Sequence, residues 1–152
     1  MKIRDCMKRN VISIPDTSTV REVAAVFVKE QVGILPIVNP NNKLVGVAGL
    51  RDLLSLVLPD FVNFVADLDF VHDFGAVETI RPPVEVLDAS IKTLIKLPIS
   101  VDEDSGLLRA YALMLQHNVH DMPVVSKDRQ LVGMISRVDI GTAILSAWAK
   151  VE

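Results

Sequence analysis

The sequence predicts a mixed α+β fold in which one β-α-β-β-α unit occurs twice. A shift of 87 positions aligns the two halves of the chain without a gap, and several identical residues then coincide. The clearest coincidences are Ser13 with Ser100, Pro36 with Pro123, Leu44-Val45-Gly46 with Leu131-Val132-Gly133, and Asp52 with Asp139. Each half also has apolar residues at helical spacing, followed by two short apolar runs around a polar turn. A unit of about 45 residues buries too little surface to be secure alone, so we expect the units to pack through their sheets with pseudo-twofold symmetry.

The first unit is expected to open with an extended segment at 11–14. A helix follows, with Thr19 and Glu22 spaced as a capping box at its start and an apolar stripe of Val20, Val23, Ala24, Phe27 and Val28. Strands are predicted at 34–38 and 44–48. A closing helix then carries Leu50, Leu53, Leu54, Val57 and Leu58 on one face.

The second unit is expected to follow the same order, beginning with an extended segment at 98–101. Asp104 or Ser105 would cap a helix whose apolar stripe is Leu107, Ala110, Tyr111, Met114 and Leu115. Strands are predicted at 122–125 and 131–135. The last helix carries Ile140, Ile144, Ala147 and Trp148. Stripes of this kind indicate packing in a core or in a dimer.

The composition excludes several classes of protein. A chain of 152 residues with 50% hydrophobic residues suits a folded domain, and its net charge of -3 argues against general nucleic-acid binding. No apolar run approaches the roughly 20 residues of a membrane span. No secretory signal opens the sequence, and the single cysteine, Cys6, cannot form an internal disulfide, so a cytoplasmic setting is expected. The mean hydropathy of +0.38 predicts a homodimer.

The chain divides into a first repeat at 1–54, an insert at 55–89 and a second repeat at 90–152. The insert contains four of the five phenylalanines, Phe61, Phe64, Phe70 and Phe74, and suggests two short amphipathic helices. They would form a dimerisation or partner surface, or cover the module's own core. Its acidic residues and histidine have no metal-ligand spacing and indicate a solvated face: Asp67, Asp69, His72, Asp73 and Glu78.

One short motif, the segment from Gly133 to Asp139, has residues that could bind a ligand. An apolar strand there ends in Ser136, and Asp139 follows three positions later. The start of a helix offers unpaired N–H groups that suit phosphate, and Asp139 could accept from sugar hydroxyls. The same two residues would equally serve as a helix cap with no ligand.

A family resemblance is carried by Ile14-Pro15-Asp16-Thr17-Ser18, by Leu35-Pro36-Ile37-Val38 and Met122-Pro123-Val124-Val125, and by the segments at Gly46 and Gly133. Lys2-Ile3-Arg4-Asp5-Cys6-Met7 resembles the lead-in that precedes such a repeat. The pattern resembles the CBS domain, and the whole chain is similar to a stand-alone tandem CBS pair, or Bateman module. The resemblance implies an adenosine-type ligand (AMP, ADP, ATP or S-adenosylmethionine) in the cleft between the repeats.

The family pattern Gly-apolar-apolar-Ser/Thr-x-x-Asp implies two sites. The preferred site, in the second repeat, would comprise Ser136, Asp139, Arg137, Ser100, Ile99, Leu97, His120, Asp121 and Met122. The first-repeat site departs from the pattern because Gly49 replaces the hydroxyl; it would comprise Asp52, Arg51, Gly49, Ser13, Ile12, Gly33, Ile34 and Leu35. Lys8 and Arg9 either serve phosphates in this cleft or form an exposed basic turn.

Three functions follow as hypotheses. The leading one is a non-catalytic regulatory module that needs no cofactor and transmits nucleotide binding to an enzyme or transporter. The alternative is a ligand-free dimerisation or interaction module. Catalysis is not expected, because Cys6 has no nucleophile signature around it and no phosphate loop of the Gly-x-x-x-x-Gly-Lys type occurs. No metal site is expected.

Overall fold

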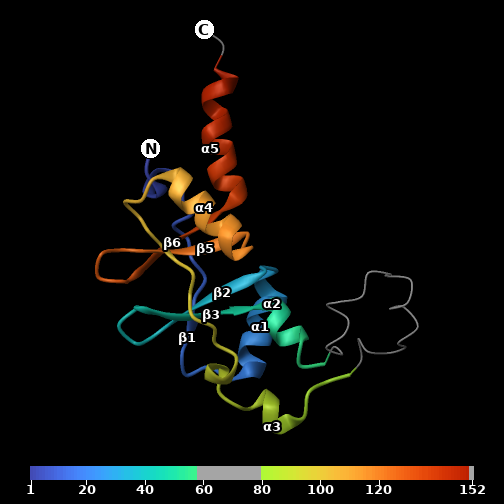
Figure 1. Cartoon of the computed structure of the whole chain (residues 1–152). Coiled ribbons are helices and arrows are strands. Elements are labelled where there is room, and N and C mark those ends of the chain that lie inside the picture. The colour runs from blue at the N-terminus through green and yellow to red at the C-terminus, as the bar shows by residue number, and fades with distance from the viewer. Residues whose placement is uncertain (58–79, 151–152) are drawn as a thin grey trace, which may run out of the picture.

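The computed structural model describes residues 1–57 and 80–150. The first repeat comprises β1 (Ile14–Pro15), α1 (Val20–Glu30), β2 (Ile34–Val38), β3 (Leu44–Gly49) and α2 (Leu50–Leu54). The second comprises β4 (Val101–Asp102), α4 (Leu107–His117), β5 (Asp121–Val125), β6 (Leu131–Ser136) and α5 (Arg137–Ala149). Before them lie the 3₁₀ turns η1 (Ile3–Asp5) and η6 (Ile91–Thr93), with α3 (Val84–Leu87) ahead of η6. Each element of the second repeat begins 87 positions after its counterpart, which confirms the internal repeat (Figure 1).

Each repeat forms its own three-stranded sheet, in the order β1-β2-β3 and β4-β5-β6. The first two strands of each sheet are parallel and the last two antiparallel. A parallel pair needs a crossover connection, which α1 and α4 supply, whereas the antiparallel pair is joined by a short turn. The structure therefore confirms the mixed α+β fold with two β-α-β-β-α units.

Two separate hydrophobic cores lie between the helices and the sheets. In the first repeat, α1 buries Val20, Val23 and Phe27, which share one face of the helix. In the second, α4 buries residues at the same relative positions, Leu107, Ala110 and Met114. The apolar stripes predicted the buried faces of these two helices, but Val28 and Leu115 at the stripe edges are exposed.

The two lead-in segments, residues 2–8 and 90–96, are exchanged: each packs on the repeat that does not directly follow it in the chain. Ile3 and Met7, at the start of the chain, belong to the core of the second repeat, whereas Ile91 belongs to the core of the first. The backbone of Lys8 exchanges two hydrogen bonds of 2.9 Å with Met134 in β6, and Lys96 makes the matching pair of 3.2 Å with Val47 in β3. The chain therefore crosses from one repeat to the other after Lys8 and again after Lys96, which ties the repeats together.

The turns of the two hairpins also meet. The N–H of Leu44 donates to the carbonyl of Arg129, and the N–H of Leu131 donates to the carbonyl of Asn42, both at 3.1 Å. Asn42 and Arg129 occupy equivalent positions, and both have left-handed backbones, with φ of 60° and 62°. These reciprocal contacts are what a pseudo-twofold relation between the sheets requires.

Replacing Arg129 by asparagine is expected to stabilise the protein. Asparagine tolerates the left-handed conformation better than arginine. For an arginine residue this conformation costs about 1–2 kcal/mol. In the first repeat Asn42 also donates its side-chain amide to the carbonyl of Leu131 at 3.2 Å, a bond that Arg129→Asn could reproduce. A rise in Tm of about 2–4 °C is expected by differential scanning calorimetry. A Tm that is unchanged or lowered would show that the left-handed turn carries no strain.

Several expectations about element boundaries are wrong. The helix α4 is capped by Gly106 and not by Asp104 or Ser105, because Asp104 instead pairs with Lys2 and Arg4 of the exchanged lead-in. The closing helix α2 ends at Leu54, short of the predicted stripe. There Ser55 donates its hydroxyl to the carbonyl of Asp52 at 2.6 Å, and only turns follow to residue 57. The first strand of each repeat, β1 and β4, begins three residues later than predicted and has two residues.

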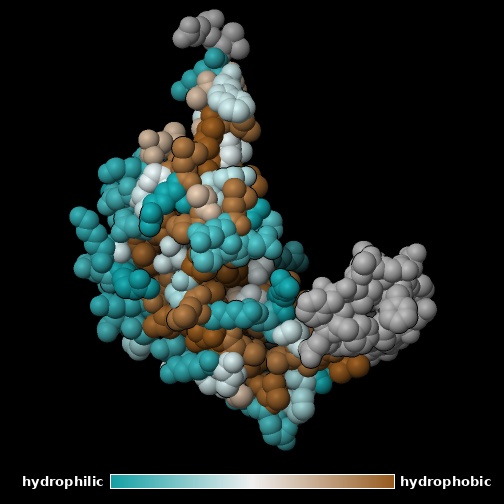
Figure 2. Space-filling model, viewed as in Figure 1, coloured by the Kyte–Doolittle hydropathy of each residue, from teal (hydrophilic) through white to brown (hydrophobic). Residues whose placement is uncertain are grey.

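The expectations for the insert fall mostly outside the described residues. The phenylalanines at 61, 64, 70 and 74 and the acidic residues between 67 and 78 lie in the segment 58–79, outside the described part of the chain. At the far end of the molecule, α5 projects from the body, and Figure 2 shows apolar side chains along it. Trp148, expected to pack in a core or a dimer, is 75% exposed, so no contact within the described chain covers it.

Candidate functional site

Ser136 and Asp139 form a reciprocal cap at the start of α5. The hydroxyl of Ser136 accepts from the N–H of Asp139 at 3.0 Å, and one carboxylate oxygen of Asp139 accepts from the N–H of Ser136 at 2.9 Å. Both side chains are half-buried. Each oxygen retains a further lone pair, so the cap holds the two side chains in place and still leaves acceptor capacity for a ligand.

The first repeat keeps half of this arrangement. Asp52 accepts from the N–H of Gly49 at 3.0 Å, as Asp139 does from Ser136, but Gly49 supplies no hydroxyl in return. The backbone of Gly49 is extended, with φ of -99°, so glycine is not required there by the backbone conformation. The two sites therefore differ in one hydroxyl, as the sequence predicted.

Each aspartate is paired with a lysine from an exchanged lead-in. The ammonium of Lys96 lies 2.7 Å from Asp52, and that of Lys8 lies 3.7 Å from Asp139. The sequence leaves Lys8 either as a phosphate ligand in the cleft or as part of an exposed basic turn, and the exchange places its ammonium beside the second-repeat aspartate. Lys96 was missed. Aligning the two lead-ins at a shift of 88 positions pairs Lys8 with Lys96, and this pairing would have pointed to Lys96.

Arg137 is engaged within the protein and is not directed at a ligand. Its guanidinium donates to the carbonyls of Val119 and Met114, at 3.0 and 3.2 Å, at the end of α4. The carbonyls at a helix C-terminus carry partial negative charge, so a cation there is well placed. Arg137 therefore joins the start of α5 to the end of α4, and its suggested contact with phosphate would require these bonds to break.

Two cavities adjoin at Gly33, on the first-repeat side of the cleft. One has a volume of about 670 Å³ and is lined by Gly33, Leu50, Arg51, Asp52, Leu54, Ser55 and Lys96. The other, of about 320 Å³, is lined by residues of both repeats and of the first crossing: Lys8, Asn10, Val11, Ile12, Val32, Gly33, Ile34, Leu35, Pro36, Asp121 and Met134. We call them the charged cavity and the inter-repeat cavity. Together they contain six of the eight residues expected at the first-repeat site.

Several expected site residues, including some on these cavity linings, are less accessible or more widely dispersed. Leu35 and Met122 are buried in the two cores, so they could offer a ligand only backbone atoms. Leu97 is 90% exposed, and His120 is exposed beside the half-buried Asp121. Ile99 packs against the second core, and Ser13 and Ser100 are half-buried at matching positions before β1 and β4.

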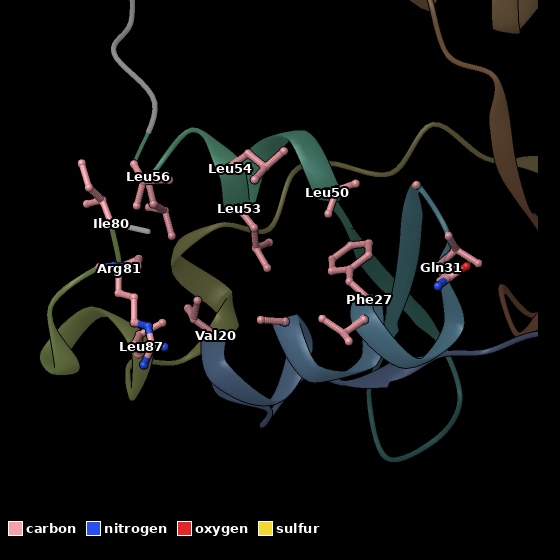
Figure 3. A pocket seen from close by; sticks show the side chains of 16 residues that line it. Val20, Phe27, Gln31, Leu50, Leu53, Leu54, Leu56, Ile80, Arg81 and Leu87 are labelled. Carbon is pink, nitrogen blue, oxygen red and sulfur yellow. The ribbon is translucent and has the colours of Figure 1, made fainter. Parts of the chain in front are cut away.

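A third cavity, of about 720 Å³, is apolar and lies between α1, α2 and the chain at 80–87 (Figure 3). Leu50 and Leu53 point from α2 toward Phe27 and Val20 of α1, and Leu54 also lines the cavity (Figure 3). Its lining is aliphatic and aromatic apart from Gln31 and Arg81, so it lacks the polar groups that orient a nucleotide. We call it the apolar groove.

Cys6 does not have the environment of a catalytic nucleophile. Burial first, and then the negative charges of Asp139 and Asp5, raise the pKa of its thiol above the ordinary value. Reactive cysteines need the opposite, a pKa lowered by cations or a helix N-terminus. Within residues 1–57 and 80–150, three or more histidine, cysteine or acidic side chains never gather as metal ligands would. None of the helices described there has the length and apolarity to cross a membrane.

The comparisons with known proteins all point to one family. Residues 3–59 and 80–146 match the CBS domain. The uncharacterized protein MJ1426 of Methanocaldococcus jannaschii is 22% identical, over 95% of this chain and 92% of its own length. Among longer relatives, the chain spans 23% of a homoserine O-acetyltransferase of Methanocorpusculum labreanum, at 24% identity, and 49% of protein MJ1225 of M. jannaschii, at 25% identity.

Solved structures show the same fold. The CBS-pair protein CBSX2 of Arabidopsis thaliana superposes with a TM-score of 0.74 at 21% identity, over 99% of this chain and 98% of that one. CBSX2 in complex with AMP gives 0.71 at 23% identity, over 97% and 98%. The CBS domain pair of protein MJ0100, in complex with 5-methylthioadenosine and S-adenosylmethionine, gives 0.68 at 19% identity, over 97% and 98%. The matched repeats and the shared fold show that this chain belongs to the CBS domain family, as a pair of CBS domains.

Proposed function

We propose that this chain is a regulatory module that binds an adenosine-type ligand in the cleft between its repeats and transmits binding to a partner protein. The observation that carries the proposal is the pair of cavities that adjoin at Gly33. Apolar side chains such as Ile12 and Ile34 on the inter-repeat cavity could pack on a base, beside the polar side chains of Lys8, Asn10 and Asp121. Asp52 in the charged cavity could accept from ribose hydroxyls. The ligands of CBSX2 and of the MJ0100 domain pair have an adenosine group in common.

The exchanged lead-ins could convert ligand binding into a change in the arrangement of the two repeats. Lys96 holds Asp52 immediately before the chain crosses to the second repeat, and Lys8 holds Asp139 immediately before it crosses to the first. A ligand that takes over either aspartate would alter these pairs and the crossing segments beside them. A regulatory effect requires the ligand to bind one arrangement of the repeats more tightly than the other. The partner that reads this change is proposed to be an enzyme or a transporter.

Isothermal titration calorimetry with AMP, ADP, ATP, adenosine and S-adenosylmethionine tests the proposal. At least one of these ligands is expected to bind. Asp52→Asn and Asp139→Asn keep an acceptor for the cap but lose the charge, and each is expected to weaken binding at its own site by about tenfold or more. Absence of heat and of a thermal shift with all five ligands would refute the proposal. Binding that neither variant changes would refute the aspartates as ribose ligands.

Replacing Gly49 by serine is expected to strengthen the first-repeat site. A Cβ at residue 49 would lie 2.9 Å from Oδ2 of Asp52, so this carboxylate must shift slightly to admit it. The added hydroxyl can then accept from the N–H of Asp52, as Ser136 does from Asp139, and can also donate to a ligand. One hydrogen bond contributes about 0.5–1.5 kcal/mol, so we expect a gain of roughly two- to tenfold in ligand affinity by calorimetry. Ser136→Gly is the reciprocal variant and should weaken the second site. A Gly49→Ser protein that is unchanged in affinity would place the ligand away from residue 49.

The apolar groove and the exposed face of α5 favour a second candidate, an interaction module that needs no ligand. Val28 and Leu54 in the groove and Leu145 and Trp148 on α5 are exposed in a single chain. Large exposed apolar patches mark association surfaces. Light scattering of the wild type and of Leu145→Glu/Trp148→Glu would test a dimer formed through α5. A wild type that is monomeric at all concentrations would exclude it.

A further inference from the structure

The helices that close the two repeats are anchored to very different degrees. The helix α5 has 13 residues, and its Ile140 is completely buried in the second core. Arg137, at the start of α5, donates to two backbone carbonyls near the end of α4. The cap is reciprocal, because Ser136 and Asp139 each bond the backbone of the other. Packing, side-chain bonds and cap together hold α5 on the second repeat.

The helix α2 lacks each of these anchors. It has five residues, and none of them is fully buried within the part of the chain that the structure describes. Its cap has no hydroxyl at Gly49, and Leu50 stands at the position of Arg137. A helix this short is marginal by itself, so α2 depends on Leu53, which packs against the first core. Of the two closing helices, α2 therefore has the lower local free energy of unfolding.

The same short helix separates the charged cavity from the apolar groove. Leu50 and Leu54 line both, and so does Gly33, whose carbonyl accepts from the N–H of Leu50 at 2.9 Å. The neighbouring residues divide between the two sides: Arg51, Asp52 and Ser55 line the charged cavity, and Leu53 lines the groove. A change in the order of α2 therefore alters the walls of both hollows at once.

We infer that α2 is the ligand-responsive element of this chain and couples the charged cavity to the apolar groove. The inference rests on the proposed function and names the element through which binding is transmitted. The point of contact is Asp52, whose carboxylate accepts from the N–H of Gly49 at 3.0 Å and lies 2.7 Å from the ammonium of Lys96. This carboxylate is held in the cavity only while α2 is formed. A ligand that bonds Asp52 therefore favours the ordered helix.

Order in α2 in turn fixes one wall of the apolar groove. Leu50 and Leu53 face Phe27 and Val20 of α1 across the groove (Figure 3). These leucines hold their places only when the helix is formed, so the ligand determines the shape of a surface that it does not touch. The coupling is reciprocal, and a change on the groove side of α2 must alter the affinity for the ligand.

Amide hydrogen exchange of the full chain, with and without ligand, tests the inference. The probe is the tightest binder among AMP, ADP, ATP, adenosine and S-adenosylmethionine by calorimetry. The reporters are the N–H groups of Ser55, Leu56 and Val57, which donate to carbonyls of α2 residues. At saturation we expect their exchange to slow by about tenfold or more, because the ligand stabilises the helix. Amides of α5 should change by less than about twofold, since that helix is already anchored.

Leu53→Ala tests the coupling from the groove side. It removes the α2 side chain that packs on the first core, so a smaller fraction of molecules has α2 formed, and we expect the ligand affinity to fall by about fivefold. Leu53→Met keeps the apolar volume and should retain the wild-type affinity. Val28→Ala is the matched control, since Val28 lines the same groove from α1 and is 77% exposed. It should leave the affinity unchanged. Circular dichroism checks that each variant is folded.

The outcomes separate the inference from the function on which it rests. If the ligand leaves exchange at Ser55, Leu56 and Val57 unchanged, or slows α5 equally, α2 is not the responsive element and ligand binding stands. A folded Leu53→Ala protein that binds as tightly as Val28→Ala would overturn the coupling to the groove. Should Leu53→Ala fail to fold, the exchange comparison on the wild type still decides. If none of the five ligands binds the wild type, the proposed function fails, and the inference fails with it.

Discussion

Replacing Gly133 by alanine is expected to destabilise the protein by about 2–3 kcal/mol, because the added methyl group overpacks a tightly closed contact. A Cβ at this position would lie 2.8 Å from the carbonyl oxygen of Lys8 and 2.7 Å from the sulfur of Met7. The methionine can move, but the carbonyl belongs to the backbone that pairs with Met134. The exchanged lead-in must therefore shift, and it takes Met7 and Ile3 partly out of the second core.

Urea unfolding of Gly133→Ala followed by circular dichroism measures this loss. Gly141→Ala is the matched control, because it adds the same methyl group within α5, where nothing lies within 4 Å of the new atom. Alanine is favoured over glycine in a helix by about 1 kcal/mol, so the control should stabilise the protein. Equal unfolding midpoints for Gly133→Ala and the wild type would show that the lead-in does not pack on β6 as described.

Gly46 provides the equivalent contact in the first repeat. A Cβ there would overlap the side chain of Ile95 and lie 3.1 Å from the carbonyl oxygen of Lys96. The conserved spacing of the Leu-Val-Gly segments within the two repeats thus has a structural cause, since each glycine admits the lead-in of the other repeat. These contacts are sufficient to require glycine at both positions without a ligand.

Replacing Arg137 by methionine is expected to lower the free energy of unfolding by about 2 kcal/mol, the scale of hydrogen bonds made by a charged group. The guanidinium donates to the carbonyl of Met114 in the last turn of α4 and to that of Val119 just after it, and methionine fills similar space with no donor. The backbone bond from the N–H of Arg137 to the carbonyl of His120, at 3.0 Å, does not depend on the side chain. We therefore expect the loss to be centred on the turn from Asn118 to Asp121.

Amide hydrogen exchange in the variant locates the effect. Protection should fall at the end of α4 and the start of β5, while the equivalent turn of the first repeat, where Leu50 replaces the arginine and its N–H donates to the carbonyl of Gly33, stays unchanged. Arg137→Lys is the control that keeps the charge but lacks the planar pair of donors, and it should recover only part of the stability. A uniform change in exchange over both repeats would contradict a local role for Arg137.

These two variants bear on function in different ways. Gly133→Ala perturbs the lead-in that carries Lys8 to Asp139, so it should alter ligand binding in the second repeat together with stability. Arg137→Met leaves the cap of Ser136 and Asp139 in place, so it should change stability more than affinity. A large loss of nucleotide affinity in Arg137→Met would instead indicate that the arginine leaves α4 and binds phosphate.

Local patterns in the sequence determined most of the secondary structure. The spacing of Val20, Val23 and Phe27 predicted the buried face of α1, and the repeat of 87 positions predicted matching elements in the second half. The motif at Ser136 and Asp139 predicted a helix start. These features depend on residues within one or two turns of each other, so periodicity and cap chemistry are enough to recognise them.

Only the tertiary structure decided how the repeats are joined and which charges share a site. Lys8 and Lys96 reach Asp139 and Asp52 because each lead-in packs on the repeat that does not follow it directly in the chain. Arg137 reads as a phosphate ligand in sequence, but the end of α4 lies within its reach and takes both donors. Such contacts join residues far apart in the chain, and their energies depend on packing that no local pattern records.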